Sequence, residues 1–232
     1  MAIERYDVNG DFAALKSALE ATEIFASVVF NESETQDTIF CYDSEEHLLF
    51  KVQFPIRLGS QDGWSFTAYK SDGTTVAGSG IGTSTTSYGS PTYLYKVGSS
   101  GILIHFNNSA SHAAVMVIGK TNTDHIGFIF PSTGITNSSG NDETVSINVC
   151  AWDDEGTKTT SLRITNAPPG MIGNSTLLVP VPLHGSYGVQ ENFRNVFFIP
   201  MAQEGMRGVV QEIIGSNNKT YLTNGYLAVL DV

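Results

Sequence analysis

Three consecutive residues, Gly119, Lys120 and Thr121, have the order found at the end of a phosphate-binding loop. That motif also needs a glycine where Ala114 stands and a flexible loop before the lysine. The four residues before Gly119 are all apolar and predict a strand instead. We therefore expect no nucleotide site at this position.

The histidines are the next candidates for catalysis or metal binding. None of them pairs with another at metal-ligand spacing on an expected helix. His105 alternates with apolar neighbours, which favours a structural histidine on the opposite face of that strand. A Cys–His nucleophilic pair stays open, because such groups meet in space and not in sequence. The five histidines are His47, His105, His112, His125 and His184.

Two loops rich in side-chain oxygens, at 141–143 and 153–155, have the ligand chemistry that calcium needs. Neither matches an EF-hand loop, and solvated hairpin tips are the favoured interpretation. A carboxylate pair for glycosidic cleavage cannot be assigned, because such pairs are recognised by their distance in space. We expect no catalytic residue, no bound metal and no cofactor.

Aromatic residues could stack on sugar rings in a lectin-like site. Aromatic residues on strands more often pack in the core or against neighbouring strands. Tyr88 differs, because it lies in a Gly-, Ser- and Thr-rich stretch, Val76 to Thr92, that predicts a long loop. The candidate contact loop for a glycan is therefore Tyr88 with Tyr93.

One helix is expected, at about residues 11–21. Asp11 can cap its first turn, and apolar residues then recur at helical spacing. After the helix the apolar pattern alternates, which predicts strands at 24–30, 38–42 and 48–55. The helix must then bury its apolar stripe against the sheet that follows.

Further short strands are expected along the rest of the chain. The sequences at 71–74 (Ser-Asp-Gly-Thr) and 224–225 (Asn-Gly) predict hairpins. Pro180 and Pro182 lack the donor that a central strand needs, so residues 177–183 form an edge strand or an extended connector.

Together these signals predict an all-β fold, an antiparallel β-sandwich or barrel-like structure with one N-terminal α-helix. The chain is expected to form a single domain over residues 1–232. A subdivision near 167–170 (Ala-Pro-Pro-Gly) is the alternative.

Charge is concentrated at the front of the chain. The formal net charge is −11, and 11 of the 23 acidic residues but only two of the 12 basic ones lie up to Glu46. This acidic front either keeps the protein soluble or forms a docking face for a basic partner surface. The residues predicted for that face are Glu20, Glu23, Glu32, Glu34 and Asp37.

The same charge balance argues against direct contact with nucleic acid, which needs clusters of Lys and Arg. The longest apolar run, Ala113 to Ile118, is too short to cross a bilayer, so no membrane insertion is expected. Met1–Arg5 begins no apolar segment of a secretory signal. Cys41 and Cys150 lie in apolar segments, so we expect two buried free thiols and synthesis in a reducing cytoplasm.

Two stretches, one near each end of the chain, carry a further signal. The first combines 15–19 (LKSAL) with 24–29 (IFASVV), and the second leads from 208–214 (GVVQEII) into 219–231 (KTYLTNGYLAVLD). Both stretches resemble small structural proteins of tailed bacteriophages. The resemblance implies a multicopy, non-enzymatic virion component of the tail, neck or baseplate. It transfers no catalytic residue.

We therefore expect a structural subunit of a virion, made in the host cytoplasm, that binds copies of itself and other virion proteins. Two alternatives remain open, because β-sandwiches serve many functions. A carbohydrate- or receptor-binding module would contact a host-surface glycan through Tyr88. A cell-wall polysaccharide hydrolase is the other, and the sequence assigns it no residues.

Overall fold

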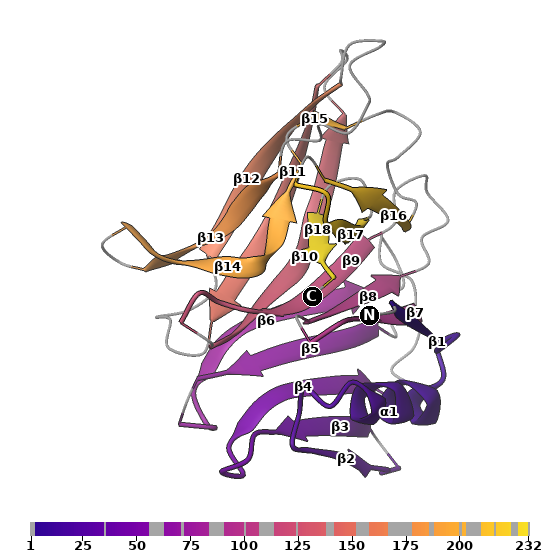
Figure 1. Ribbon diagram of the computed structural model, residues 1–232. Helices are drawn as coiled ribbons and strands as arrows, with labels where there is room; N and C mark the ends of the chain where they lie inside the picture. The colour runs from indigo at the N-terminus through magenta and orange to yellow at the C-terminus, as the bar shows by residue number, and fades with distance from the viewer. Residues whose placement is uncertain are drawn as a thin grey trace.

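In the computed structural model three β-sheets lie in layers, and the described part of the chain has one α-helix (Figure 1). The sheets are antiparallel apart from one short parallel strand pair. The predicted all-β, sandwich-like fold with a single N-terminal helix is therefore confirmed. The structure describes residues 3–34, 36–55, 63–70, 72–83, 91–99, 101–106, 114–123, 125–137, 142–151, 158–166, 178–185, 188–199, 201–202, 210–215, 217–223 and 227–231.

The N-terminal sheet is a meander in which each strand pairs with the next along the chain. All three strands predicted after the helix are present, and the first begins later than expected, at Ser27. In sheet order the strands are β2 (Ser27–Asn31), β3 (Gln36–Tyr42), β4 (Leu48–Pro55), β5 (Gly63–Tyr69) and β6 (Val76–Thr83).

The central sheet is the largest, and it joins the start of the chain to its middle. Its first strand, β1 (Glu4–Asp7), pairs with β7, which lies far along the sequence. The remaining strands, in sheet order, are β7 (Pro91–Val97), β8 (Gly101–Phe106), β9 (Ala114–Lys120), β10 (Ile126–Asn137), β11 (Asp142–Ala151), β12 (Lys158–Asn166) and β15 (Met201–Ala202).

The C-terminal sheet forms the third layer. Its prolines, Pro180 and Pro182, lie on an edge strand, which confirms that part of the prediction. The predicted C-terminal hairpin is also present, and its turn at 224–225 lies outside the described residues. In sheet order the strands are β13 (Val179–Gly185), β14 (Gly188–Phe198), β18 (Leu227–Leu230), β17 (Thr220–Thr223) and β16 (Gln211–Ile214).

The helix, α1 (Phe12–Ala21), begins where the sequence predicts. The Asp11 carboxylate accepts a hydrogen bond from the Ala14 amide at 2.8 Å and so caps the first turn. Leu15, Ala18 and Leu19 are buried. They pack between the N-terminal and central sheets, so the helix closes one end of that core.

The middle strands of the central sheet, β8, β9 and the start of β10, are buried on both faces. Ile102 and Ile104 of β8 join the core shared with the N-terminal sheet, and Leu103 between them joins the core shared with the C-terminal sheet. Strands covered on both faces have continuous apolar runs, because neither set of alternating side chains meets water. The apolar run that ends before Gly119 lies in β9, which confirms that it is a strand and not a phosphate-binding loop.

The prediction of a loop from Val76 to Thr92 is wrong over its first half. Residues 76–83 form β6, which pairs with β5 along most of its length. Ala77 is buried, and the strand lies beside β10 and β11 of the central sheet. Glycines at alternate positions of β6 lower its strand propensity, but they also let another backbone approach closely. Residues 84–90 lie outside the described part of the chain.

The turn predicted at 71–74 connects β5 and β6. Gly73 has a φ of +66°, which favours glycine, and the Asp72 carboxylate accepts from the Thr74 amide at 2.8 Å. Of the two cysteines expected to be buried and free, Cys41 is both, and burial raises the pKa of its thiol. The side chain of Cys150, on β11, lies outside the part that the structure describes.

Candidate functional surfaces

Tyr93, one of the two residues predicted for a contact loop, lies on β7 among aromatic and charged neighbours. Its ring stacks on His105 with centroids 5.9 Å apart and lies 6.2 Å from Tyr95. The Arg5 guanidinium lies over the same ring, at 4.9 Å. Arg5 also forms an ion pair with Asp7 at 3.3 Å. Tyr88, its predicted companion, lies outside the described residues.

His105 lies on the opposite face of β8 from Ile104, as the alternation predicts. Its Nδ1 is buried, and no hydrogen-bond partner for it stands among the described residues. Burial lowers the pKa of His105, because the low-dielectric surroundings disfavour the imidazolium. Burial therefore favours the neutral form of the ring that stacks on Tyr93.

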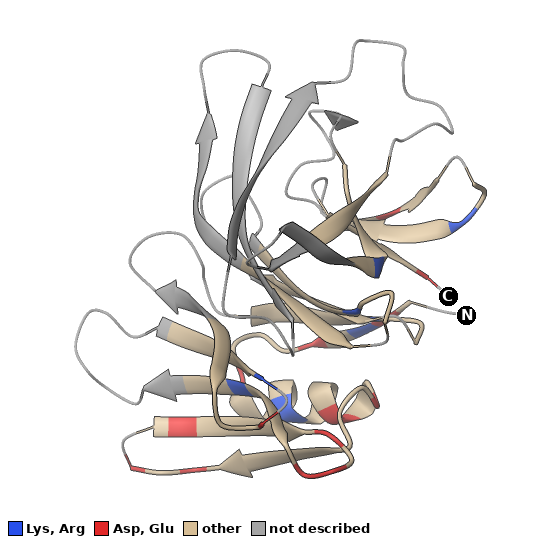
Figure 2. Cartoon of the chain, turned by 90° about the vertical axis from the view of Figure 1, so that its left-hand side faces the viewer, with Lys and Arg blue, Asp and Glu red and all other residues tan. Residues whose placement is uncertain are grey.

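The five acids predicted for one docking face separate into two groups. Glu20 and Glu23 lie at the end of α1, beside the start of β2, and Glu32, Glu34 and Asp37 lie at the β2–β3 turn. The length of β2, about 13 Å, separates the two groups. In the cartoon of Figure 2 the positions of Asp and Glu, in red, lie towards both ends of the N-terminal sheet. The acids therefore frame β2 at its two ends.

Further acids join the first group in the turn between β3 and β4. The Asp43 carboxylate accepts from the amides of Glu45 and His47, at 2.9 and 2.8 Å, and lies 3.1 Å from the His47 imidazole Nδ1. Burial alone would raise the pKa of Asp43, but these hydrogen bonds outweigh it and hold the pKa below its usual range. The carboxylate thus organises the turn.

We expect Asp43→Ala to lower the free energy of unfolding by about 1–2 kcal/mol at neutral pH, since the turn amides lose an ionised acceptor. Because the folded pKa is depressed, this contribution is present above the unfolded pKa, about 3.9, and disappears as pH falls through the folded value. Urea unfolding across the acid range measures it, with the exposed Glu45→Ala as control. A difference that stays constant from neutral to strongly acid pH would contradict the assigned role.

An open groove of about 390 Å³ lies between the end of α1 and the central sheet. Lys96 spans it, with Nζ 3.4 Å from the Ala21 carbonyl oxygen and 3.9 Å from a Glu4 carboxylate oxygen. Tyr6 donates to Glu4 at 2.7 Å, and that bond raises the pKa of Tyr6 to about 12. The groove is lined by Glu4, Thr22, Glu23, Ile24, Lys96, Gly98, Ser99 and Lys120.

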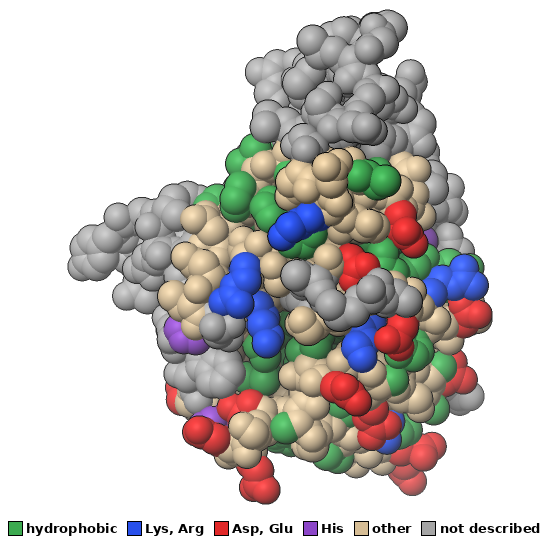
Figure 3. Space-filling model, viewed as in Figure 1, with side chains coloured by type: hydrophobic (Ala, Val, Ile, Leu, Met, Phe, Trp, Pro, Cys, Tyr) green, Lys and Arg blue, Asp and Glu red, His purple; other side chains and the backbone are tan. Residues whose placement is uncertain are grey.

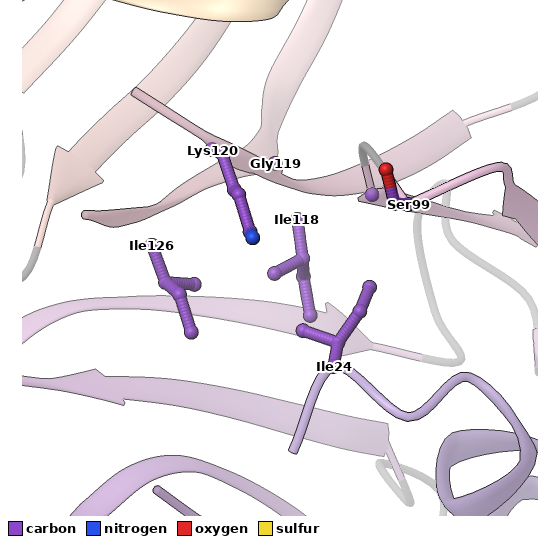
Figure 4. Close-up of a pocket in the computed structure, with 7 residues that line it drawn as sticks. Ile24, Ser99, Ile118, Gly119, Lys120 and Ile126 are labelled. Atoms are coloured by element: carbon purple, nitrogen blue, oxygen red, sulfur yellow. The ribbon is translucent and has the colours of Figure 1, made fainter. Parts of the chain in front are cut away.

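The inner end of the groove is apolar and narrow. Ile24, from the segment after α1, lies opposite Ile118 and Ile126 of the central sheet, and Lys120 extends beside them (Figure 4). This recess has a volume of about 10 Å³, at the lower limit of the space that one water molecule needs. Carboxylates and ammonium groups line the outer part together, so the groove favours no single ligand charge.

The free edge of β2 is a surface that the sequence did not single out. Within the described strands β2 pairs only with β3, from Ser27 opposite Tyr42 to Asn31 opposite Thr38. Val28 is buried towards the core, and Val29 on the other face is 47% exposed. Val29 stands opposite Phe40, whose ring stacks with Tyr42 at 6.4 Å. An unpaired backbone edge thus adjoins a small apolar patch.

Among the described residues no group of three or more His, Cys, Asp or Glu side chains is arranged to hold a metal ion. In the same part of the chain no helix is long and apolar enough to span a membrane. No family model, no curated protein and no solved structure matches this chain. The resemblance to phage structural proteins therefore stays a prediction from the sequence.

Proposed function

We propose that this protein is a non-enzymatic structural subunit of a tailed-phage virion, which binds copies of itself and neighbouring virion proteins. The observation that carries the proposal is the open edge of β2. Every second residue of an edge strand directs its N–H and C=O groups outward, so such an edge can pair with another chain. The apolar Val29 and Phe40 beside it can then be covered in the same contact.

Two other sheet edges carry the features that prevent such pairing. β1 places charged side chains along its length, from Glu4, Arg5 and Asp7. β13 contains Pro180 and Pro182, which cannot donate to a new strand. Charged residues and prolines usually prevent an exposed edge strand from pairing with another chain, and β2 contains neither. The difference supports a contact role for β2 in particular.

A second described edge suits contact between copies. β16 is the outer strand of the C-terminal sheet, and its Ile214 is 59% exposed. Only one charged residue, Glu212, lies on this strand. Pairing between edges related by a twofold axis would cover Ile214 from both copies. The two open edges lie on different layers, so one subunit can bind two neighbours at once.

Light scattering of the purified protein tests this role. We expect a defined multimer whose mass persists at high salt, because apolar and backbone contacts are weakly screened. Ile214→Lys should shift the population towards monomer by about tenfold or more in the association constant, since the contact would bury a charge.

Val76→Lys is the matched control, because Val76 is similarly exposed, at 50%, on β6 of another sheet. A monomer at high concentration, and also in the presence of neighbouring virion proteins, would overturn the structural role.

A further inference from the structure

Building on the structural role above, we propose that the free edge of β2 accepts an extended strand of a different protein, one whose ends carry lysine or arginine. The apolar centre of β2 supplies the pairing surface, and the acids at its two ends select the partner. The occupant is thus a basic-flanked β-strand and not a second copy of this chain.

The carboxylates that frame β2 stand close to its two ends in the register of the sheet. At one end Ser27 lies opposite Tyr42, and the Ala26 amide donates to the Tyr42 carbonyl at 2.9 Å, so the chain around Glu23 adjoins the β3–β4 turn. Glu45 and Glu46 of that turn are exposed. At the other end Glu32 and Glu34 follow Asn31 directly and are exposed as well.

Among the described residues, lysines lie near the acids of α1, since Glu20 pairs with Lys16 and Glu23 lines the groove with Lys96 and Lys120, so the exposed acids of the two turns carry the selection. Lys51 stands two strands from Val29 in the same register row, about 10 Å away, and its ammonium lies over the Tyr69 ring. Lys16 is held by Glu20 in an i,i+4 pair at 2.5 Å. Figure 3 shows acidic side chains gathering over the lower part of the molecule, where the N-terminal sheet lies.

The framing acids make a second copy a poor occupant in either orientation. In an antiparallel β2–β2 pair, Glu32 and Glu34 of one copy would meet the Glu23 end of the other. In a parallel pair each acidic end would meet its own equivalent. Like charges placed opposite each other destabilise strand pairing, whereas complementary charges steer and fix it.

The sign of the salt dependence separates the two occupants. Repulsion between copies is screened by salt, so pairing of β2 with itself would strengthen as ionic strength rises. Attraction for a basic-flanked strand is screened in the same way, so its binding would weaken. The contact of Ile214 between copies, proposed above, is a separate surface and predicts neither response.

Fluorescence anisotropy with a labelled peptide tests the proposal on the full chain. The probe has a core of alternating threonine and valine with two lysines at each end, and its control has glutamates in place of the lysines. We expect the lysine-flanked probe to bind at least about tenfold more tightly, with affinity falling as salt rises. A third peptide, methylated on alternate backbone nitrogens, keeps the charge but cannot pair as a strand, and it should not bind.

Val29→Lys should weaken binding of the lysine-flanked probe by about tenfold or more, and Val76→Lys should not. Circular dichroism checks that both variants keep their strands. The double substitution Glu32→Gln with Glu34→Gln is a second test of the proposal, one that leaves the residues of β2 unchanged. Equal binding of the methylated probe, or binding that grows with salt, would overturn the proposal. A multimer that ignores the probe would refute this partner and leave the structural role standing. Binding of the probe by a protein that stays monomeric at high concentration, also with neighbouring virion proteins present, would do the reverse.

Discussion

Phe50→Ala is expected to lower the free energy of unfolding by about 3–5 kcal/mol, a large share of the stability of a typical domain. Phe50 lies on β4 and is fully buried between the N-terminal and central sheets. Its ring lies 6.3 Å from Phe25, 6.1 Å from Phe66 and 5.5 Å from Phe128. Removing the Phe50 ring leaves a cavity that the stacked rings around it, which belong to two different sheets, cannot fill. Each lost aromatic contact lowers the free energy of unfolding further.

Phe40→Ala on the neighbouring strand is the matched control. Phe40 lies on the outer face of the same sheet and is only half-buried, so its loss should cost less than about half as much. Urea unfolding followed by fluorescence and by circular dichroism measures both variants. If the two substitutions lower the free energy of unfolding by the same amount, the Phe50 ring does not pack between the two sheets.

The elements that the sequence predicts well are those whose signals are local. The helix at 11–21 follows from the Asp11 cap and the apolar spacing after it, both within a few residues. The turn at 71–74 follows from Gly73, whose positive φ is accessible to glycine. Such signals need no knowledge of what packs against the element.

The elements that the sequence misses depend on distant partners. β1 has charged residues and no apolar period, and it exists because Glu4–Asp7 pairs with Tyr93–Lys96. β6 contains glycines that suggest a loop, and it is held by β5 on one side and the central sheet on the other. Tertiary context overrides local strand propensity in both.

The candidate surfaces follow the same division. Counting charges locates the acidic front, but only the β2–β3 turn shows that Glu23 and Glu34 stand at opposite ends of a strand. The neighbours of Tyr93 come from β1 and β8, and no sequence pattern links Arg5 to His105. The apolar run at Ile102–Ile104 did hold a usable signal, since a strand apolar at every position is covered on both faces.

Phe193→Ala, at the contact between the central and C-terminal sheets, is also expected to lower the free energy of unfolding by about 3–5 kcal/mol. Phe193 of β14 is buried, and its ring lies over glycines of β9 and β10. A Cβ atom at Gly127 would stand 2.6 Å from the ring, and one at Gly119 would stand 3.4 Å from it. Glycine at these positions therefore makes room for the ring, so Gly127→Ala alone should cost about 1–3 kcal/mol by overpacking.

The double variant distinguishes this arrangement from two unrelated defects. Once Phe193 is alanine, the methyl group of Gly127→Ala enters space that the ring has left, so the second change should cost little or nothing. The coupling energy from the double-mutant cycle should reach about 1–3 kcal/mol, and simple additivity would show that ring and glycines do not touch. Since β9 and β10 contribute to both cores, Phe193→Ala and Phe50→Ala should each lower one shared unfolding transition. Two separate transitions, each moved by only one of the variants, would instead divide the chain into independent domains.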